Sequence, residues 1–173
     1  TARVQGVQQA LAASDSAASV ALEMGVLASV GTAPSSEAKK EIIGQLRAMY
    51  RTPHSACDIF PSESDITFWK VIMQGPEGSS YAEGTWLLSV RFPPNYPLSP
   101  PEVRFVTPIV HCNINCYGKV CHSILDRNWT SDTSTYDVLS YVYGLLLTPD
   151  KSDPLDSTLA LQAYNDDGAY EAN

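Results

Sequence analysis

The stretch from Val110 to Trp129 constrains the fold most, because it is long and shows neither helical nor strand periodicity beyond short apolar pieces at its ends. It contains three of the four cysteines and two of the three histidines of the chain. A connection of this length within a compact domain is usually functional or disordered, and its Ile, Val, Leu and Trp residues argue against disorder. We therefore expect an ordered loop that holds a reactive group. The candidate is Cys121, because a thiolate is the strongest nucleophile available near neutral pH.

Length and composition favour one domain with a sizeable core, since the chain has 173 residues of which 44% are hydrophobic. Cysteines crowded into one loop do not resemble a secreted disulfide framework, and we expect neither a signal peptide nor a membrane-spanning segment. This pattern indicates a reducing compartment, the cytoplasm or the nucleus. The net charge of −8, spread along the chain, disfavours nucleic acid and membrane partners and favours a protein with a basic face.

Residues 1–36 are rich in Ala, Ser, Val and Gly and predict at most one or two weak helices. Their apolar groups are Val4, Val7 and Leu11, and then Val20, Leu22, Met24, Val26 and Leu27. Three interpretations remain open: a mobile linker, a helix packed on the domain, and a docking helix for the rest of a larger protein. Residues 37–173 form the main domain, and a helical pattern that has just begun at Ala169 leads us to expect truncation at the C-terminal end of a longer chain.

The segment from residue 37 to residue 106 predicts one helix followed by strands. Apolar residues with helical spacing follow the start signal at Pro34-Ser35-Ser36-Glu37, and Thr52-Pro53 ends the helix. The residues expected on its buried face are Ala38, Ile42, Ile43, Leu46, Met49 and Tyr50. Alternation then predicts strands over 66–74, 85–92 and 102–106, with Trp69, Val71 and Met73 on one face and Phe68 and Ile72 on the other. Short turns between them favour an antiparallel meander with a helix on one face.

Two helices are expected after the irregular loop. A capping box at Ser134-Thr135-Tyr136-Asp137 precedes a strongly apolar segment that ends at Thr148-Pro149, and a further helix is expected from about Ser157 to Tyr164. The predicted class is α+β.

Short motifs along the chain fall in one family's order and spacing. They are Gly75-Pro76, Tyr81, Gly84, Phe92-Pro93, Tyr96-Pro97, Pro100-Pro101, His111-x-Asn113-Ile114, Gly118-x-x-Cys121, Ile124-Leu125, Trp129 and Asp153-Pro154-Leu155. Over roughly residues 37–167 the chain resembles the catalytic domain of the ubiquitin-conjugating enzymes. The resemblance implies a four-stranded antiparallel meander sheet with an N-terminal helix and C-terminal helices, one strand more than alternation predicts.

The resemblance also implies roles for residues of the loop and beyond it. Cys121 would accept ubiquitin, or a ubiquitin-like modifier, as a thioester and pass it to a substrate lysine or a ligase. Asn113 would stabilise the oxyanion or brace the loop, and these two roles stay open. Asp153 would orient the incoming lysine and help to lower its pKa, and Ser123 occupies the family's gate position. His111 would hold the loop by hydrogen bonds, and no cofactor or metal ion is implied.

Partner-binding residues follow from the same resemblance. Lys39 and Lys40 on the N-terminal helix would face the activating enzyme. A ubiquitin ligase would contact Pro97 and Leu98 in the proline-rich loop and Thr130 and Ser131 after the tryptophan. An alternative source of ligase function is another part of the same larger protein.

Three departures from the family pattern affect these expectations. His111-Cys112-Asn113 stands where the family usually has His-Pro-Asn, so a rigid φ is given up. Glu41, Gly44 and Gln45 occupy part of the helix face that normally carries basic residues. The sequence Thr130-Ser131-Asp132 replaces the common Ser-Pro-Ala.

Other interpretations of the loop remain. The main alternative is a catalytically inactive variant of the same fold that binds ubiquitin or a ligase. A zinc site would use His111, Cys112, Cys116, Cys121 and His122, but their spacings match no closed pattern of paired ligands. A cysteine hydrolase would need His122 to activate Cys121, although sequence neighbours seldom direct both side chains to one point. An oxidative trap involving Cys112 or Cys116 is a further hypothesis.

Overall fold

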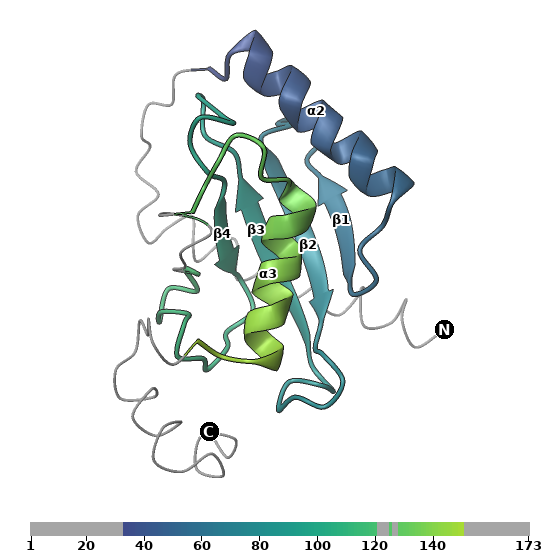
Figure 1. Ribbon diagram of the computed structural model, residues 1–173, viewed down its shortest axis with the longest axis vertical. Helices are drawn as coiled ribbons and strands as arrows, with labels where there is room; N and C mark the ends of the chain where they lie inside the picture. Colours follow the sequence, from purple (N-terminus) through teal and green to yellow (C-terminus); the bar gives the residue numbers. More distant parts are fainter. Residues whose placement is uncertain (1–32, 121–124, 126–127, 151–173) are drawn as a thin grey trace.

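The computed structural model describes residues 33–120, 125 and 128–150, which form an α+β domain (Figure 1). The described elements, in chain order, are helix α2 (Ser36–Arg51), strands β1 (Cys57–Pro61), β2 (Phe68–Gln74), β3 (Thr85–Arg91) and β4 (Glu102–Phe105), and helix α3 (Thr135–Leu147). Cys121, Ser123 and Asp153 lie outside the described residues, as do residues 1–32 and the helix expected near Ser157.

The four strands form one sheet in the order β1-β2-β3-β4, and each neighbouring pair is antiparallel. This arrangement confirms the four-stranded meander implied by the family resemblance. β1 is the strand that alternation did not predict, because its apolar residues Ile59 and Phe60 are adjacent and it ends at a proline. Its pairing with β2, from Cys57 with Met73 to Pro61 with Trp69, adds it to the edge of the sheet.

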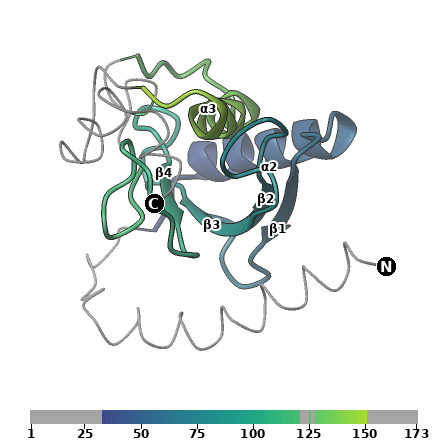
Figure 2. The same cartoon turned by 90° about the horizontal axis from the view of Figure 1, so that it is seen from below.

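Both described helices lie on the same side of the sheet, as the view from below shows (Figure 2). The core lies between them and the inner strand face, where Trp69, Val71 and Met73, the three residues predicted to share one face, are fully buried. Helix α3 runs across the sheet, and its capping box is confirmed: the Ser134 hydroxyl accepts the Asp137 N–H at 3.1 Å while the Asp137 carboxylate accepts the Ser134 N–H at 3.1 Å.

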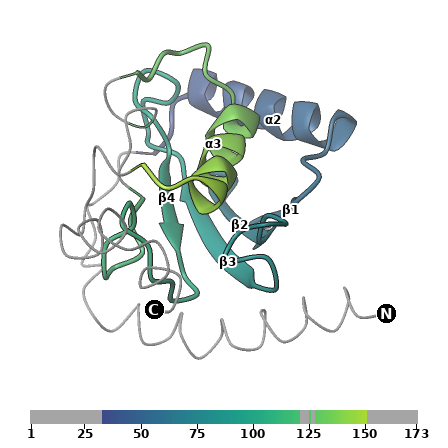
Figure 3. The ribbon, with the colours of Figure 1, turned by 60° about the horizontal axis from the view of Figure 1, so that its bottom comes forward.

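Helix α2 begins where expected, since the Ser35 hydroxyl accepts the Ala38 N–H at 3.0 Å. Its buried face is narrower than predicted. Ala38, Ile42 and Met49 are buried, but Ile43 is 38% exposed and Tyr50 is 64% exposed. The prediction that these two residues face the core is therefore wrong. The helix crosses one end of the sheet (Figure 3). Its core residues Ala38, Ile42 and Met49 form a single stripe, so residues flanking that stripe reach solvent.

No helix among the described residues is long and apolar enough to span a bilayer.

Candidate active site

The segment that leads to Cys121 is fixed on the free edge of β4. The Phe105 N–H donates to the Gly118 carbonyl at 2.7 Å, and the Val120 N–H donates to the Val103 carbonyl at 3.3 Å. Gly118 has a φ of +73°, and a Cβ there would lie 2.0 Å from the Phe105 carbonyl oxygen. Only glycine suits this left-handed, tightly packed position. The backbone is thus held in place up to the residue immediately before the candidate nucleophile.

A compact turn precedes that contact. The Asn115 side-chain oxygen accepts the N–H groups of Tyr117 at 3.0 Å and of Lys119 at 2.9 Å. The Gly118 N–H donates to the Asn115 carbonyl at 2.8 Å. Cys116 and Tyr117 are exposed at the tip of the turn. An Asn that closes a turn by bonding backbone N–H groups is typical Asx chemistry, and the run Asn-Cys-Tyr-Gly is the sequence signal for it.

His111 ties the start of the loop to helix α3. It is fully buried, its Nδ1 accepts the Asn113 N–H at 3.0 Å, and its Nε2 lies 2.9 Å from the Leu145 carbonyl oxygen. Because Nδ1 accepts, Nε2 carries the proton and donates to Leu145. Burial lowers the pKa of His111, and the hydrogen bond to Leu145 opposes that effect. The neutral His111 imidazole makes one hydrogen bond at each ring nitrogen and so holds the loop in place, which is the role expected of it.

Asn113 joins the loop to the chain just beyond α3. Its side chain is fully buried; Nδ2 donates to the Asp150 carbonyl at 2.7 Å, and Oδ1 accepts the Asp150 N–H at 2.9 Å. This paired arrangement, which we call the Asn113–Asp150 clasp, connects positions 37 residues apart in sequence. Because the Nδ2 and Oδ1 atoms of Asn113 both form hydrogen bonds with the backbone of Asp150, the clasp fixes the Asn113 side chain and joins the loop to the segment after α3. The sequence gives no sign of the partner, since Asp150 contributes its backbone.

Cys112 occupies the position where the family usually has proline. The Ile114 N–H donates to the His111 carbonyl at 3.1 Å, so Cys112 and Asn113 are the central residues of a tight turn. Neither has a positive φ, which fits a type I turn, where proline is favoured at the first central position. Cys112 is fully buried and its Sγ lies 3.4 Å from the Asn113 side-chain oxygen. A small buried side chain with a weak S–H donor thus replaces the ring.

The two loops expected to meet a ligase lie against each other. The Trp129 indole N–H donates to the Pro97 carbonyl at 2.9 Å, and the Trp129 and Tyr96 rings are 6.1 Å apart. Next to this contact Leu98 is 77% exposed. Thr130 and Ser131 are exposed as well. The four predicted ligase-binding residues therefore come from two loops. A hydrogen bond and a ring contact join these loops.

Lys39 and Lys40 are exposed near the start of α2. The Ser35 N–H donates to the Pro94 carbonyl at 3.3 Å, so this end of the helix adjoins the proline-rich loop. Gln45, one of the departures on this helix, has a structural role. Its side-chain oxygen accepts the Thr135 N–H at 3.0 Å, at the first turn of α3. Gln45 thus joins α2 to the first turn of α3.

The cysteines in the described residues differ in their surroundings. Burial, with Asp58 nearby, raises the pKa of Cys57 to about 12, which makes that thiol inert. Cys112 is buried and Cys116 is exposed. Among the described residues no group of three or more His, Cys, Asp and Glu side chains could hold a metal ion. Two of the five ligands of the zinc hypothesis, Cys121 and His122, lie outside that part of the chain.

Comparison with known proteins agrees with the fold. Residues 39–173 match the ubiquitin-conjugating enzyme family. The chain belongs to this family. A probable bifunctional E2/E3 enzyme of Acanthamoeba polyphaga mimivirus is 50% identical over 122 residues, which are 70% of this chain and 9% of that protein. The matched region therefore spans less than a tenth of the length of this relative.

Proposed function

We propose that this chain is an active ubiquitin-conjugating domain that carries ubiquitin, or a ubiquitin-like modifier, as a thioester on Cys121. The observation that carries the proposal is the fixed approach to this residue. Val120 and Gly118 are bonded to β4, and the Asn113–Asp150 clasp holds the opposite side of the loop. Such rigid support is what a nucleophile needs in order to meet a bulky activated partner in one geometry.

The proposed reaction has two acyl transfers. In the first, the Cys121 thiolate attacks the thioester carbonyl of the modifier on the activating enzyme; a new C–S bond forms and the enzyme's thiolate leaves. In the second, a lysine amine attacks the Cys121 thioester; a C–N bond forms, the amine loses a proton, and the Cys121 thiolate leaves. A thioester suits a carrier because its carbonyl is activated and a thiolate is a good leaving group.

Other residues support these steps in the proposal. Asn113 braces the loop through its clasp, Asp153 orients the lysine and Ser123 stands at the gate beside the thioester. Asp150, held by the clasp, lies three positions before Asp153. The clasp thereby limits how far the chain bearing this acid can move from the loop, since three residues span at most about 10 Å.

Partners follow from the exposed surfaces. Lys39 and Lys40 would meet the activating enzyme, whereas Pro97, Leu98, Thr130 and Ser131 would meet a ligase. Because the relative of 50% identity is named as a probable E2/E3 enzyme and is much longer, we also propose that ligase parts of a larger protein can supply this partner.

The test is a charging assay. The purified chain is incubated with activating enzyme, ATP and ubiquitin, and compared with Cys121→Ala and Cys121→Ser with and without reductant. We expect a reductant-sensitive adduct that is absent in Cys121→Ala and becomes a reductant-resistant ester in Cys121→Ser. The exposed Cys116→Ala is the matched control and should charge normally. Failure to charge with ubiquitin, and with related modifiers and their activating enzymes, would refute the proposed enzymatic function. It would favour the alternative, a catalytically inactive variant that binds ubiquitin or a ligase.

A further inference from the structure

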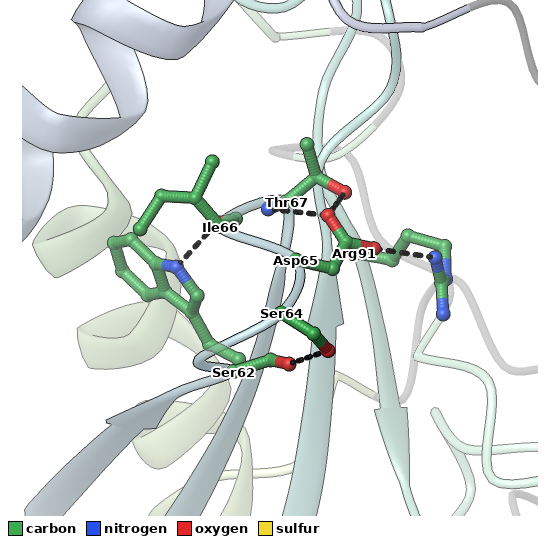
Figure 4. Close-up of polar contacts among 7 residues, drawn as sticks. Ser62, Ser64, Asp65, Ile66, Thr67 and Arg91 are labelled. Atoms are coloured by element: carbon green, nitrogen blue, oxygen red, sulfur yellow. Dashed lines mark hydrogen bonds and ion pairs between the residues drawn. The ribbon is translucent and has the colours of Figure 1, made fainter.

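The connection between β2 and β3, residues 75–84, lies at the same end of the domain as the C-terminal end of α3 (Figure 1). It differs from the turn between β1 and β2, whose hydrogen bonds stay local. In that turn the Asp65 carboxylate accepts the Thr67 N–H at 3.0 Å (Figure 4). The Trp69 indole N–H donates to the Ile66 carbonyl at 2.9 Å. The β2–β3 connection instead presents a side chain that reaches the candidate active site.

Two glycines fix the backbone from which that side chain, Tyr81, extends. The Gly75 N–H donates to the Gly84 carbonyl at 3.0 Å, and the Gly84 N–H donates to the Tyr81 carbonyl at 2.9 Å. A Cβ at Gly75 would overlap the Tyr81 carbonyl oxygen, and a Cβ at Gly84 would overlap the indole of Trp86. Because only glycine permits these close approaches, the backbone of Tyr81 is held in one place.

The Tyr81 side chain contacts the start of the active-site loop. Its hydroxyl donates to the Val110 carbonyl at 2.7 Å, although the two residues are 29 positions apart in sequence. Its ring lies 5.7 Å from the His111 ring and 5.7 Å from the Trp86 ring, with the edge of one ring towards the face of the other in the second pair. The β2–β3 connection therefore holds the beginning of the loop, in addition to β4 and α3.

The position of His111 matters for the rest of the loop. Its imidazole meets two backbone groups at once, the Asn113 N–H at 3.0 Å and the Leu145 carbonyl at 2.9 Å. Both bonds require the His111 backbone to stay in one place, and the Tyr81 hydroxyl fixes the carbonyl immediately before it. A shift at Val110 would therefore be passed through His111 to Asn113.

We propose that Tyr81 is a positioning residue for thioester transfer: through Val110 and His111 it sets the Asn113 amide in the loop that leads to Cys121. This inference rests on the function proposed above. The hydroxyl is the atom that matters, because a role in packing alone needs only the ring. Water can replace a hydrogen bond near the surface at small cost in stability. A displacement of about 1 Å near the reacting groups can, however, slow a reaction by about 100-fold.

The test compares Tyr81→Phe with Tyr117→Phe in the full chain. Tyr117→Phe is the matched control, because it removes the same atom from a side chain of the same loop that is 78% exposed. Each protein is charged to completion, the activating enzyme is stopped by chelating magnesium, and free lysine is added. We expect Tyr81→Phe to reach the parental extent of charging and to discharge about tenfold more slowly. The factor should be the same at every lysine concentration, because the loop and not lysine binding is altered. Tyr117→Phe should discharge at the parental rate.

Two further measurements separate positioning from a general loss of structure. The NMR signals of the Asn113 side-chain amide should shift in Tyr81→Phe and not in Tyr117→Phe. In an Asn113→Ala background Tyr81→Phe should add little further slowing, because the residue through which it acts has been removed. Thermal unfolding of each variant sets an assay temperature at which all of them are folded.

The proposal is overturned if Tyr81→Phe discharges at the parental rate, if Tyr117→Phe is slowed equally, or if the full slowing persists in the Asn113→Ala background. Unchanged Asn113 amide signals in Tyr81→Phe also overturn it. These results leave the proposed function intact, since the chain still charges. An unaltered chain that does not charge at all refutes the proposed function, and the role of Tyr81 with it.

Discussion

Replacing Asn113 by alanine should destabilise the domain substantially, because it removes both hydrogen bonds of the Asn113–Asp150 clasp. The bonds measure 2.7 and 2.9 Å, and the Asn113 side chain is fully buried. A buried polar group that loses its partner costs about 1–3 kcal/mol. The Asp150 backbone is only partly buried and can regain some hydration. For the two bonds we therefore expect a loss of about 2–4 kcal/mol in the free energy of unfolding, or about 6–12 °C in Tm.

Urea titration followed by tryptophan fluorescence measures this loss, and the charging assay is run on the same samples. If Asn113 braces the loop, Asn113→Ala loses stability and charges slowly. If its amide serves only the oxyanion, stability should stay within about 0.5 kcal/mol of the parent while discharge to lysine falls. That second result would refute the bracing argument.

Asn113→Asp separates the two halves of the clasp. An aspartate keeps the acceptor for the Asp150 N–H but sets a carboxylate oxygen against the Asp150 carbonyl, where Nδ2 now donates at 2.7 Å. Burial and this contact raise the pKa of the introduced carboxyl in the folded state, so the native chain binds its proton more tightly than the unfolded chain. Stability relative to the parent should therefore recover as pH falls. A difference that does not change with pH would contradict the assigned orientation of the amide.

Four further outcomes are expected. Cys112→Pro should preset the turn and raise the free energy of unfolding by about 0.4–1 kcal/mol relative to Cys112→Ala in urea titration; a loss would show that proline does not fit the turn. Tyr96→Phe should not destabilise by more than about 0.5 kcal/mol, because the buried Tyr96 hydroxyl makes no hydrogen bond of good geometry in the described part of the chain, although the Thr135 side chain lies near it; a larger loss in thermal unfolding would show that the Tyr96–Thr135 contact is a true hydrogen bond. Leu98→Ala should leave charging unchanged and reduce ligase-stimulated discharge, and equal discharge would remove Leu98 from the interface. Burial lowers the pKa of His111 and His54, so the unfolded chain binds more protons near pH 6; stability should fall as pH drops below about 6.5, and a flat profile would contradict it.

The sequence by itself determined those features that depend only on residues a few positions apart. Alternation placed Trp69, Val71 and Met73 on one face and Ile72 on the other, because side chains along a strand have a period of two whatever the partner. The capping box at Ser134 and Asp137 determined where α3 begins, because the groups that satisfy the first N–H donors lie within three residues. The motif spacing likewise led to the correct family before any geometry was known.

The tertiary structure decided what depends on distant partners. β1 became a strand by pairing with β2, although its five residues carry little signal of their own. Ile43 and Tyr50 are exposed because the width of a helix's buried face depends on what it packs against. The clasp joins Asn113 to backbone atoms of Asp150, 37 residues away, and any residue type except proline could have supplied those atoms. Sequence patterns encode interactions within a few positions, whereas the hydrogen bonds that hold the loop from His111 to Val120 arise from contacts that only the folded chain brings together.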